Sequence, residues 1–402
     1  MKDNLEQKAI EAFAATFGGA ATISARAPGR VELLGNHTDY NGGLVLAAAI
    51  DRETVVVGRP KPLGDRSVRV RSLNLDQTES FDLSNISQGE PGSWGRYVRG
   101  ATWVVQDERG PIETGFDAVI AGDVPLGAGL SSSASAQVAV ALFALRVMNG
   151  DSLVELNDDE RMNLARAVRR AENEFVGVNA GLLDPFTSLF GRQGCAVMLD
   201  CKTLEYQRVP LGESPPAIVV CDTGTSRKLA DGMYNRRRDE CERIVAHFAR
   251  ERGDQTVKSL RDIALADLES AWESLDDPGR SRARHVLTEN DRVQAGAQAL
   301  VEGDLQAFGT LMSASHASSR DDFENSSHAL DAMIKAASLA PGFIGGKLSG
   351  AGWAGCAVAL VEADKAAAFV ESVEQAYRRS TGLEPKLHVC RAAEGASSRT
   401  LP

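Results

Sequence analysis

The spacing of apolar positions predicts a first part of the chain in which strands and helices are mixed. Leu5, Ala9, Phe13 and Phe17 recur at helical spacing, which predicts an amphipathic helix that ends at the glycine pair after it. Apolar and alternating runs predict strands at residues 22–27, 44–48, 54–58, 67–72 and 116–121. Helical periodicity is found at residues 96–106, 132–148 and 158–175. Strands and helices do not alternate strictly, so the pattern favours an α+β arrangement.

The second part of the chain is richer in polar helices. Strands are predicted at residues 195–199 and 217–221, and charged helices at 231–252, 259–275, 280–302, 304–317 and 324–339. A strand at 355–361, a helix at 365–381 and a strand at 387–390 follow. Because 402 residues are too many for one typical core, we predict a mixed α/β protein with two domains, residues 1–190 and 191–402. No repeat or linker separates them, so the boundary depends on Gly191, Gly194 and the change of pattern.

Composition and charge narrow the functional classes. A hydrophobic content of 43% and a charged content of 25% are typical of a globular protein, and a net charge of −11 disfavours binding to nucleic acid. The six cysteines form no Cys-x-x-Cys pair, which predicts reduced thiols rather than a zinc site or disulfides. The chain has neither a leader-like start nor an apolar run of about 20 residues. We therefore predict a cytoplasmic protein that binds small molecules and no membrane.

The stretch at residues 127–134 is suited to holding phosphate groups. Its residues are Gly127, Ala128, Gly129, Leu130, Ser131, Ser132, Ser133 and Ala134. The stretch follows a predicted strand and opens a predicted helix, whose first N–H groups and dipole favour an anion. The alternative is an ordinary glycine-rich turn with a serine N-cap, and the loop alone does not decide between them.

Residues 27–43 form a second candidate segment, a turn region between strands. Arg30, Asn36, His37, Asp39 and Tyr40 lie close together in it and offer many directional donors and acceptors. Such a cluster is typical of a site that recognises a polyhydroxylated ligand. Each residue taken singly is compatible with a structural role, and the functional interpretation depends on their density.

Two further segments carry candidate chemistry. Residues 345–355 hold a third glycine cluster, which either brings backbone close to a ligand or forms a tight loop between core elements. Asp184 lies in an apolar, glycine-flanked run, where it either accepts a proton from a substrate hydroxyl or caps a helix before Pro185. Glu172, near a helix end, is a candidate ligand for a hard cation such as Mg²⁺.

Three of these segments, in this order and spacing, resemble the three motifs of the GHMP small-molecule kinases. They are residues 28–30 with 35–40, residues 125–134 and residues 345–352. Within that superfamily the chain resembles the galactokinases, to which residues 222–241 and 315–322 are also similar. The resemblance covers almost the whole chain from residue 25 to residue 389.

The resemblance implies an N-terminal and a C-terminal domain with the active site between them. It also implies transfer of the γ-phosphoryl group of ATP to the anomeric hydroxyl of a sugar, with Asp184 as the catalytic aspartate and Arg30 beside the reacting hydroxyl. Ser133 and Glu172 match the Mg²⁺ ligands, residues 127–134 match the phosphate loop, and Trp94 matches a tryptophan near the adenine. The sugar-contacting positions are matched by Asn36, His37, Thr38, Asp39, Gly181 and Tyr234.

Two departures from the family pattern concern the substrate. Galactokinases usually read Arg-Val-Asn-Leu-Ile-Gly-Glu-His-Thr-Asp-Tyr, whereas this chain has Glu32 and Asn36, so that asparagine and glutamate are exchanged. The family's glutamate at the position of Asn36 resembles a contact to the sugar's 6-hydroxyl, and a neutral amide there tolerates a carboxylate. Galacturonate is therefore an alternative substrate, unless Glu32 reaches the same region. Pro185 replaces the family's usual glutamine and affects fine positioning rather than reaction class.

A second alternative is a sugar sensor without turnover, because the family includes binding paralogues. The phosphate loop, Glu172, Asp184 and Arg30 are all intact in this chain, which favours the enzyme. For the assembly we expect a monomer, with a homodimer as the alternative.

Overall fold

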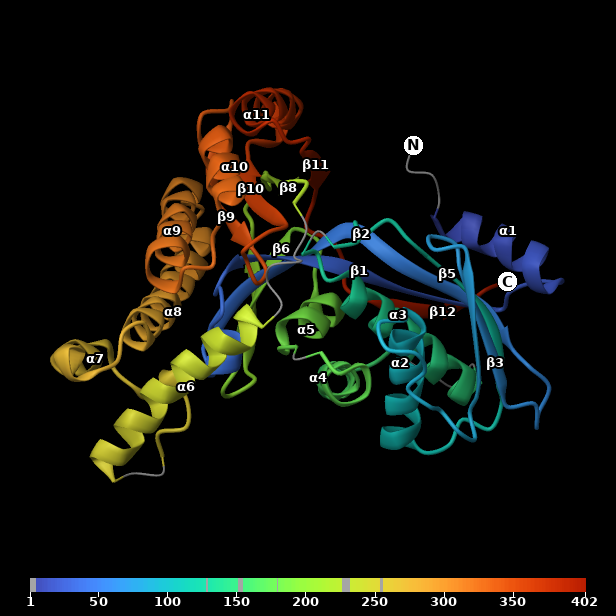
Figure 1. Cartoon of the computed structure of the whole chain (residues 1–402). Coiled ribbons are helices and arrows are strands. Elements are labelled where there is room, and N and C mark those ends of the chain that lie inside the picture. Colours follow the sequence, from blue (N-terminus) through green and yellow to red (C-terminus); the bar gives the residue numbers. More distant parts are fainter. Residues whose placement is uncertain (1–4, 128, 151–154, 179, 226–231, 254–255) are drawn as a thin grey trace.

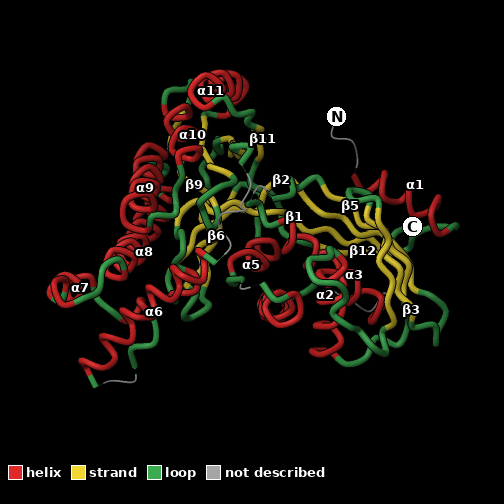
Figure 2. Tube along the Cα trace, in the orientation of Figure 1, coloured by secondary structure: helices red, strands yellow, loops and turns green. Residues whose placement is uncertain are grey.

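Two β-sheets organise the computed structural model, which describes residues 5–127, 129–150, 155–178, 180–225, 232–253 and 256–402 (Figures 1 and 2). The larger sheet has the order β12-β1-β2-β5-β3-β4, and β6 and β7 extend it from the first residues of β2. Its strands are β1 (Ile23–Leu34), β2 (Leu44–Pro60), β3 (Ser67–Ser72), β4 (Gln77–Asp82), β5 (Phe116–Gly122), β6 (Cys195–Asp200), β7 (Tyr206–Pro210) and β12 (Ser397–Thr400). Within it only β3 and β5 pair in parallel.

The smaller sheet is antiparallel throughout and lies in the C-terminal half. Its order is β11 (Lys386–Cys390), β8 (Ala217–Asp222), β10 (Cys356–Val361) and β9 (Phe343–Ser349). The helices are α1 (Leu5–Phe17), α2 (Gly95–Arg109), α3 (Ser132–Asn149), α4 (Asp158–Arg170), α5 (Leu183–Phe190), α6 (Met233–Arg252), α7 (Leu265–Ser270), α8 (Gly279–Val301), α9 (Leu305–Ser318), α10 (His328–Ser338) and α11 (Ala366–Thr381). Two π-helical segments, Ala171–Val176 and Ser319–Phe323, follow α4 and α9.

Helices cover both faces of the larger sheet (Figure 1). Successive side chains of a strand point to opposite faces, so Val55 and Val57 of β2 pack with α1 while Val56 packs with α3 and its neighbours. The helix predicted from Leu5 to Phe17 is confirmed. Helix α3 is apolar on nearly all sides because it lies between the sheet and the other helices of that layer.

A shared apolar core joins the two sheets. Val31 and Leu46 of the larger sheet pack in one cluster with Val220 and Val358 of the smaller sheet, together with residues of α8 and α9. The other face of the smaller sheet is covered by α10 and α11. Strand β1 therefore runs from the core beneath α3, where Ile23 and Ala25 lie, into the shared core, where Val31 and Leu33 lie.

The mixed α/β class is confirmed, and several predicted elements need correction. Residues 44–60 form one strand, because β1 pairs along both of its apolar stretches across the charged residues between them. The helix predicted at 259–275 is broken into 3₁₀ turns around the short α7. Residues 345–349 belong to β9, so the third glycine cluster is a loop only from residue 350 onward.

The sheets do not divide at residue 190. Strands β6, β7 and β12 all follow residue 190 in the chain, yet they pair within the larger sheet. The sequence does not predict which sheet these strands join, because pairing with a distant strand produces no periodicity in the residues themselves. All six cysteines are free thiols, as predicted. Among the described residues no helix combines the length and the apolarity that a bilayer span requires.

Candidate active site

A cavity of about 650 Å³ lies where the two halves of the chain meet. The residues that line it include Arg30, Glu32, Asn36, His37, Asp39, Gly127, Gly129, Leu130, Ser131, Ser132, Ser133, Glu172, Gly181, Asp184 and Tyr234. The fold thus brings together most of the candidate residues, from four segments that are far apart in the chain. Thr38, Ala134 and Trp94 are not part of this lining, and Ala128 lies outside the described residues.

Arg30 and Asp184 form an ion pair at the cavity wall. Arg30 lies on β1 beside a β-bulge, and Asp184 is the second residue of α5, so that 154 residues separate them in the chain. Arg30 Nε donates to Asp184 Oδ1 at 2.7 Å, and Nη2 lies 2.6 Å from the same oxygen. The Arg30 side chain is buried whereas the Asp184 side chain is 27% exposed. The buried Arg30 guanidinium therefore holds the Asp184 carboxylate at the surface of the cavity.

The serine-rich loop lies directly beside this pair. Arg30 Nη1 donates to the Gly129 carbonyl at 2.6 Å, and the Arg30 backbone N–H donates to the Leu130 carbonyl at 3.1 Å. Gly127 and Gly129 have φ values of 75° and 71°, in the left-handed region where glycine is favoured. Ser131, also left-handed, donates its hydroxyl to Asp184 Oδ2 and does not cap α3. The N-cap alternative is therefore wrong, and the first N–H groups of α3 have no side-chain cap from Ser131.

Glu172 and Ser133 form a second polar pair at the cavity. Glu172 lies in the π-helical segment after α4 and is only 5% exposed, and Ser133 lies close enough to lower the pKa of its carboxyl. Burial, and secondarily the charge of Asp184, raises the pKa of Glu172 to about 7. A buried carboxylate with a neighbouring hydroxyl fits Mg²⁺, which takes few protein ligands and completes its shell with phosphate oxygens and water.

A smaller cavity of about 310 Å³ adjoins the first. Tyr97, Ser132 and Ser133 line both cavities, and Trp94 lines only the smaller one. The remaining lining is largely apolar, with residues of β5, α2 and the loop before α3. An aromatic wall beside the serine-rich loop suits a flat heteroaromatic ring attached to phosphates.

The turn after β1 presents His37 and Asp39 to the cavity. Burial lowers the pKa of His37 to about 3, and its ring nitrogens hydrogen bond to the Tyr40 hydroxyl and the Ala351 carbonyl. Burial raises the pKa of Asp39 to about 6. Gly181 lies directly against Asp39, because a Cβ at Gly181 would come within 1.6 Å of Asp39 Oδ2. A side chain at residue 181 would therefore displace the Asp39 carboxylate from this position.

Thr38 differs from the other residues of this turn. It is fully buried, and its hydroxyl is within hydrogen-bond distance of the Gly35 and Leu44 carbonyls, at 2.7 and 2.6 Å. The structure therefore gives Thr38 a role in holding the turn rather than in lining the cavity.

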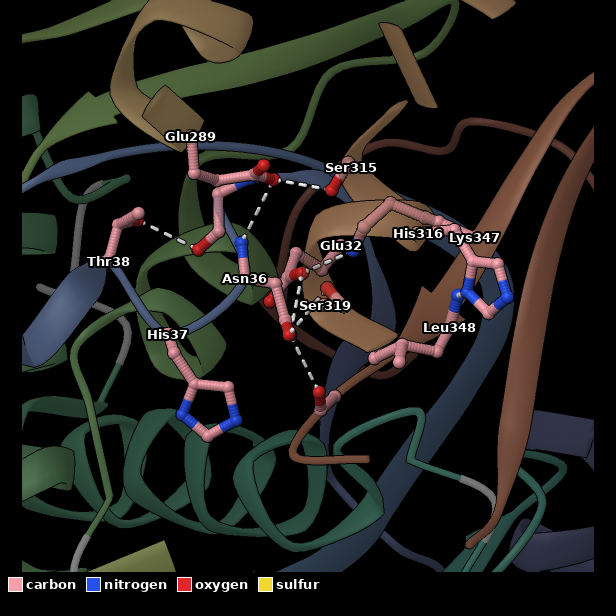
Figure 3. Close-up of polar contacts among 12 residues, drawn as sticks. Glu32, Asn36, His37, Thr38, Glu289, Ser315, His316, Ser319, Lys347 and Leu348 are labelled. Carbon is pink, nitrogen blue, oxygen red and sulfur yellow. Dashed lines mark hydrogen bonds and ion pairs between the residues drawn. The ribbon is translucent and has the colours of Figure 1, made fainter. Parts of the chain in front are cut away.

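A buried carboxylate, Glu289 of α8, fixes the same turn from behind (Figure 3). Its Oε1 accepts from the Gly35 N–H at 2.9 Å, from the Asn36 N–H at 3.4 Å and from the Ser315 hydroxyl at 2.6 Å. Arg292 donates to its Oε2 at 2.5 Å. Burial alone raises the pKa of Glu289, but Arg292 and the other positive groups and donors lower it to about 2. Glu289 is thus fully paired by protein groups.

Tyr234 reaches the cavity from the first turn of α6, which a buried ionic cluster anchors. Arg237 and Arg282 both pair with Glu240, at 3.0 and 3.1 Å, and all three side chains are almost fully buried. Arg237 Nε also donates to the Phe323 carbonyl at 2.7 Å. These contacts connect α6 to α8 and to the second π-helical segment.

Tyr97 and Lys347 are polar residues at or beside the site that sequence reasoning did not select. Tyr97 lines both cavities, although the sequence singled out only its neighbour Trp94. Lys347 is completely buried on β9, and its Nζ lies 2.6 Å from Glu32 Oε1 (Figure 3). The only local signal for Lys347 was a lysine among glycines, because its partner lies 315 residues earlier in the chain.

Family models match most of the functional segments. The galactokinase galactose-binding signature matches residues 11–60, the GHMP kinases N terminal domain matches residues 96–192, and the GHMP kinases C terminal model matches residues 297–379. A galactokinase from Roseiflexus sp. (strain RS-1) is 41% identical over 96% of this chain and 95% of its own length. A galactokinase from Chloroflexus aurantiacus is 40% identical over 96% of each chain.

Solved structures show the same likeness. The crystal structure of Lactococcus lactis galactokinase complexed with galactose matches with a TM-score of 0.88 and 33% identity, covering 96% of this chain and 98% of that chain. The mevalonate kinase of Methanococcus jannaschii matches with a TM-score of 0.63 and 19% identity over 94% of this chain and 99% of its own, a likeness of fold alone.

Proposed function

The chain belongs to the galactokinase family of the GHMP kinases, and we propose that it transfers the γ-phosphoryl group of ATP to the anomeric hydroxyl of galactose. The products are galactose 1-phosphate and ADP. The observation that carries this proposal is the contact between Arg30 and Asp184, 2.7 Å from Nε to Oδ1, beside the start of α3. A guanidinium and a carboxylate at the open end of a phosphate-binding loop are the groups that such a transfer requires.

In this proposal Asp184 and Arg30 act on the reacting hydroxyl. Asp184 accepts a hydrogen bond, and during the transfer the proton, from the anomeric hydroxyl, whose oxygen then bonds to the γ-phosphorus. Arg30 stabilises the negative charge that develops on the transferred group. The Ser131 hydroxyl and the buried Arg30 side chain hold the Asp184 carboxylate in one orientation before the substrate arrives.

The nucleotide is proposed to occupy both cavities. The backbone N–H groups of residues 129–134 and the first turn of α3 bind the phosphates, and Trp94 with Tyr97 contacts the adenine in the smaller cavity. The shared lining at Ser132 and Ser133 supports this, because the two cavities are adjacent at the position expected for the phosphates.

Glu172 and Ser133 are proposed to hold Mg²⁺. When bound, the ion neutralises phosphate charge during the transfer. The buried position of Glu172 beside the Ser133 hydroxyl supports this assignment. Glu172→Gln should therefore increase the Mg²⁺ concentration needed for half-maximal rate, with little effect on the affinity for the sugar.

The sugar is proposed to bind between the turn after β1 and α6. His37, Asp39, Gly181 and Tyr234 line that part of the cavity, as does Asn36. The backbone at Gly181 leaves space for Asp39, whose carboxylate accepts hydrogen bonds from the sugar.

A sugar panel tests this function. ADP release is measured with galactose, N-acetylgalactosamine, arabinose and galacturonate, and the product is identified by its phosphorus NMR signal. We expect galactose to give the highest kcat/KM and a phosphate on the anomeric oxygen. Binding of galactose without ADP release would instead support the sensor, and a higher rate with galacturonate would support the uronate alternative. We include in the proposal a cytoplasmic monomer, which size-exclusion chromatography with light scattering checks for its assembly state.

A further inference from the structure

Glu32 of β1 forms a buried ion pair at the edge of the main cavity. Its Oε1 accepts from Lys347 Nζ at 2.6 Å and from Asn36 Nδ2 at 3.2 Å (Figure 3). Lys347 is completely buried, and Glu32 is 5% exposed. Since an ammonium without a partner is very costly to bury, Glu32 and Lys347 fix each other's position.

Asn36, in contrast, uses its whole side chain within the protein. Its Nδ2 donates to Glu32 Oε1 and to the Gly350 carbonyl at 2.8 Å. Its Oδ1 accepts from Asn325 Nδ2 at 2.8 Å and from the Ser319 hydroxyl at 3.4 Å. An amide group has two N–H donors and one oxygen with two lone pairs, so all of its hydrogen-bonding capacity is taken.

The second carboxylate oxygen of Glu32 is different. Oε2 has no hydrogen-bond partner among the residues that the structure describes, yet it is not sealed from solvent, and Glu32 lines the cavity together with Arg30, Asp39 and Asp184. An almost buried carboxylate oxygen without a donor is unfavourable unless a ligand supplies one. The acceptor that meets the ligand is therefore Glu32, four residues before Asn36.

We infer that Glu32 is a specificity-determining residue that accepts a hydrogen bond from a hydroxyl of the sugar substrate, with Lys347 holding its carboxylate in place. This rests on the proposed sugar kinase function and deepens it. Because the accepting group is an anion whose other oxygen is already paired, a hydroxyl is favoured there and a carboxylate is repelled. The exchange of asparagine and glutamate between positions 32 and 36 therefore retains an acidic site and disfavours galacturonate.

The test compares substrates that each lack one hydroxyl. The singly deoxygenated galactoses and galacturonate are assayed with the wild type and with Glu32→Gln/Lys347→Met, in which the loss of both charges avoids a buried unpaired ammonium. For the wild type we expect one deoxy sugar to lose about 10- to 100-fold in kcat/KM, the usual effect of a hydrogen bond to a charged group. In the variant the same sugar should lose less than about threefold relative to galactose, and the galacturonate-to-galactose ratio should rise.

A matched control removes a different buried pair. Lys61 and Asp117 lie 3.4 Å apart with side chains 10% and 7% exposed. Asp117 also pairs with the half-exposed Arg69 at 2.8 Å, and none of the three lines either cavity. Lys61→Met/Asp117→Asn should lower stability while leaving the relative rates of the deoxy sugars unchanged. A further variant, Glu32→Asn/Asn36→Glu, moves the carboxylate to the position that the family pattern favours, and it should recover galactose kcat/KM relative to Glu32→Asn alone.

The two levels of the proposal fail in different ways. If galactose is a good substrate and every deoxy-sugar penalty is the same in the wild type and in Glu32→Gln/Lys347→Met, Glu32 does not contact the sugar and the inference is overturned. If calorimetry detects no binding of galactose to the wild type and the kinetic assay detects no ADP release with it, the proposed function itself is wrong, and this inference with it.

Discussion

Glu172 and Glu289 are both almost fully buried carboxylates, but the protein treats them in opposite ways. Glu289 accepts hydrogen bonds from two backbone N–H groups, a serine and Arg292, and its pKa is about 2. Ser133 and Gln137 offset the burial of Glu172 only in part, and its pKa is about 7. Burial raises the pKa of both groups, so the number of compensating partners makes the difference. An incompletely paired group at a cavity indicates a ligand, whereas a completely paired one indicates a structural role.

The largest effect should come from the cavity side of this comparison. Asp184→Asn removes the proton acceptor but keeps the shape, so we expect kcat with galactose to fall by about 10²- to 10⁴-fold. Arg30 loses its ionic partner, so the denaturant midpoint should also fall, but less than in Glu289→Gln, because the Asp184 side of the pair is 27% exposed. Coupled ADP-release kinetics and urea unfolding on the same preparation check both expectations. Near-wild-type turnover in this variant would remove Asp184 from the mechanism.

Glu289→Gln should show the opposite profile. The change leaves Arg292 without its ionic partner at a buried site, which should lower the free energy of unfolding by about 3 kcal/mol. Turnover per folded molecule should fall far less than in Asp184→Asn, since Glu289 does not line the cavity. Urea unfolding measures the first quantity, and kinetics well below the unfolding midpoint measure the second. A loss of turnover as large as that of Asp184→Asn would contradict the division between the two regions.

The pH dependence of stability sharpens the comparison. The ring nitrogens of His285 hydrogen bond to the Ser318 hydroxyl and the Asn36 carbonyl. Burial lowers the pKa of this histidine from 6.5 to about 4. The unfolded chain therefore binds a proton below pH 6.5 that the folded chain does not, and stability falls as the pH decreases from 6.5 to 4. Across that window His285 should account for about 3 kcal/mol at most.

Urea unfolding of the wild type and of His285→Asn, each referred to its own value at pH 7.5, isolates this contribution. The variant should lose less stability on acidification than the wild type.

Asp39 acts in the opposite direction, because a raised pKa makes the folded state the stronger proton binder between pH 6 and 3.8. Asp39→Asn should thus lose more stability than the wild type over that range. Identical pH profiles for all three proteins would contradict these assignments.

The smallest effects come from two matched hydroxyl groups. Ser131 donates to Asp184 in the cavity, and Ser315 donates to Glu289 in the interior. Ser315→Ala should lower the free energy of unfolding by about 1–2 kcal/mol with unchanged kcat. Ser131→Ala should lower kcat by about 3- to 10-fold with little change in stability, because Arg30 still holds the carboxylate. Equal kinetic effects of the two substitutions would argue against a special role for the serine-rich loop.

Much of the site could be predicted because its signals are local. Within residues 116–149, the spacing of apolar residues predicts a strand before the glycine loop and a helix after it, and the structure confirms both elements. The candidates Arg30, Glu172 and Asp184 were found through motifs, and the fold places all three on one cavity. Thr38 had the same kind of signal but lies behind the turn, because adjacent residues of a tight turn point in different directions.

The sequence by itself determined most of the helices and strands, the family and the list of candidate residues, since backbone preferences and motif spacing act over a few neighbouring positions. Only the tertiary structure decided which charges meet. Arg30 pairs with Asp184, which is 154 residues away in the chain, and Glu32 pairs with Lys347, which is 315 residues away. The tertiary structure also decided that β12 pairs with β1 at the edge of the larger sheet. Burial and ionic partners depend on segments that approach each other only in the fold. These contacts give Glu172 and Glu289 their different pKa values and place Glu32 at the cavity.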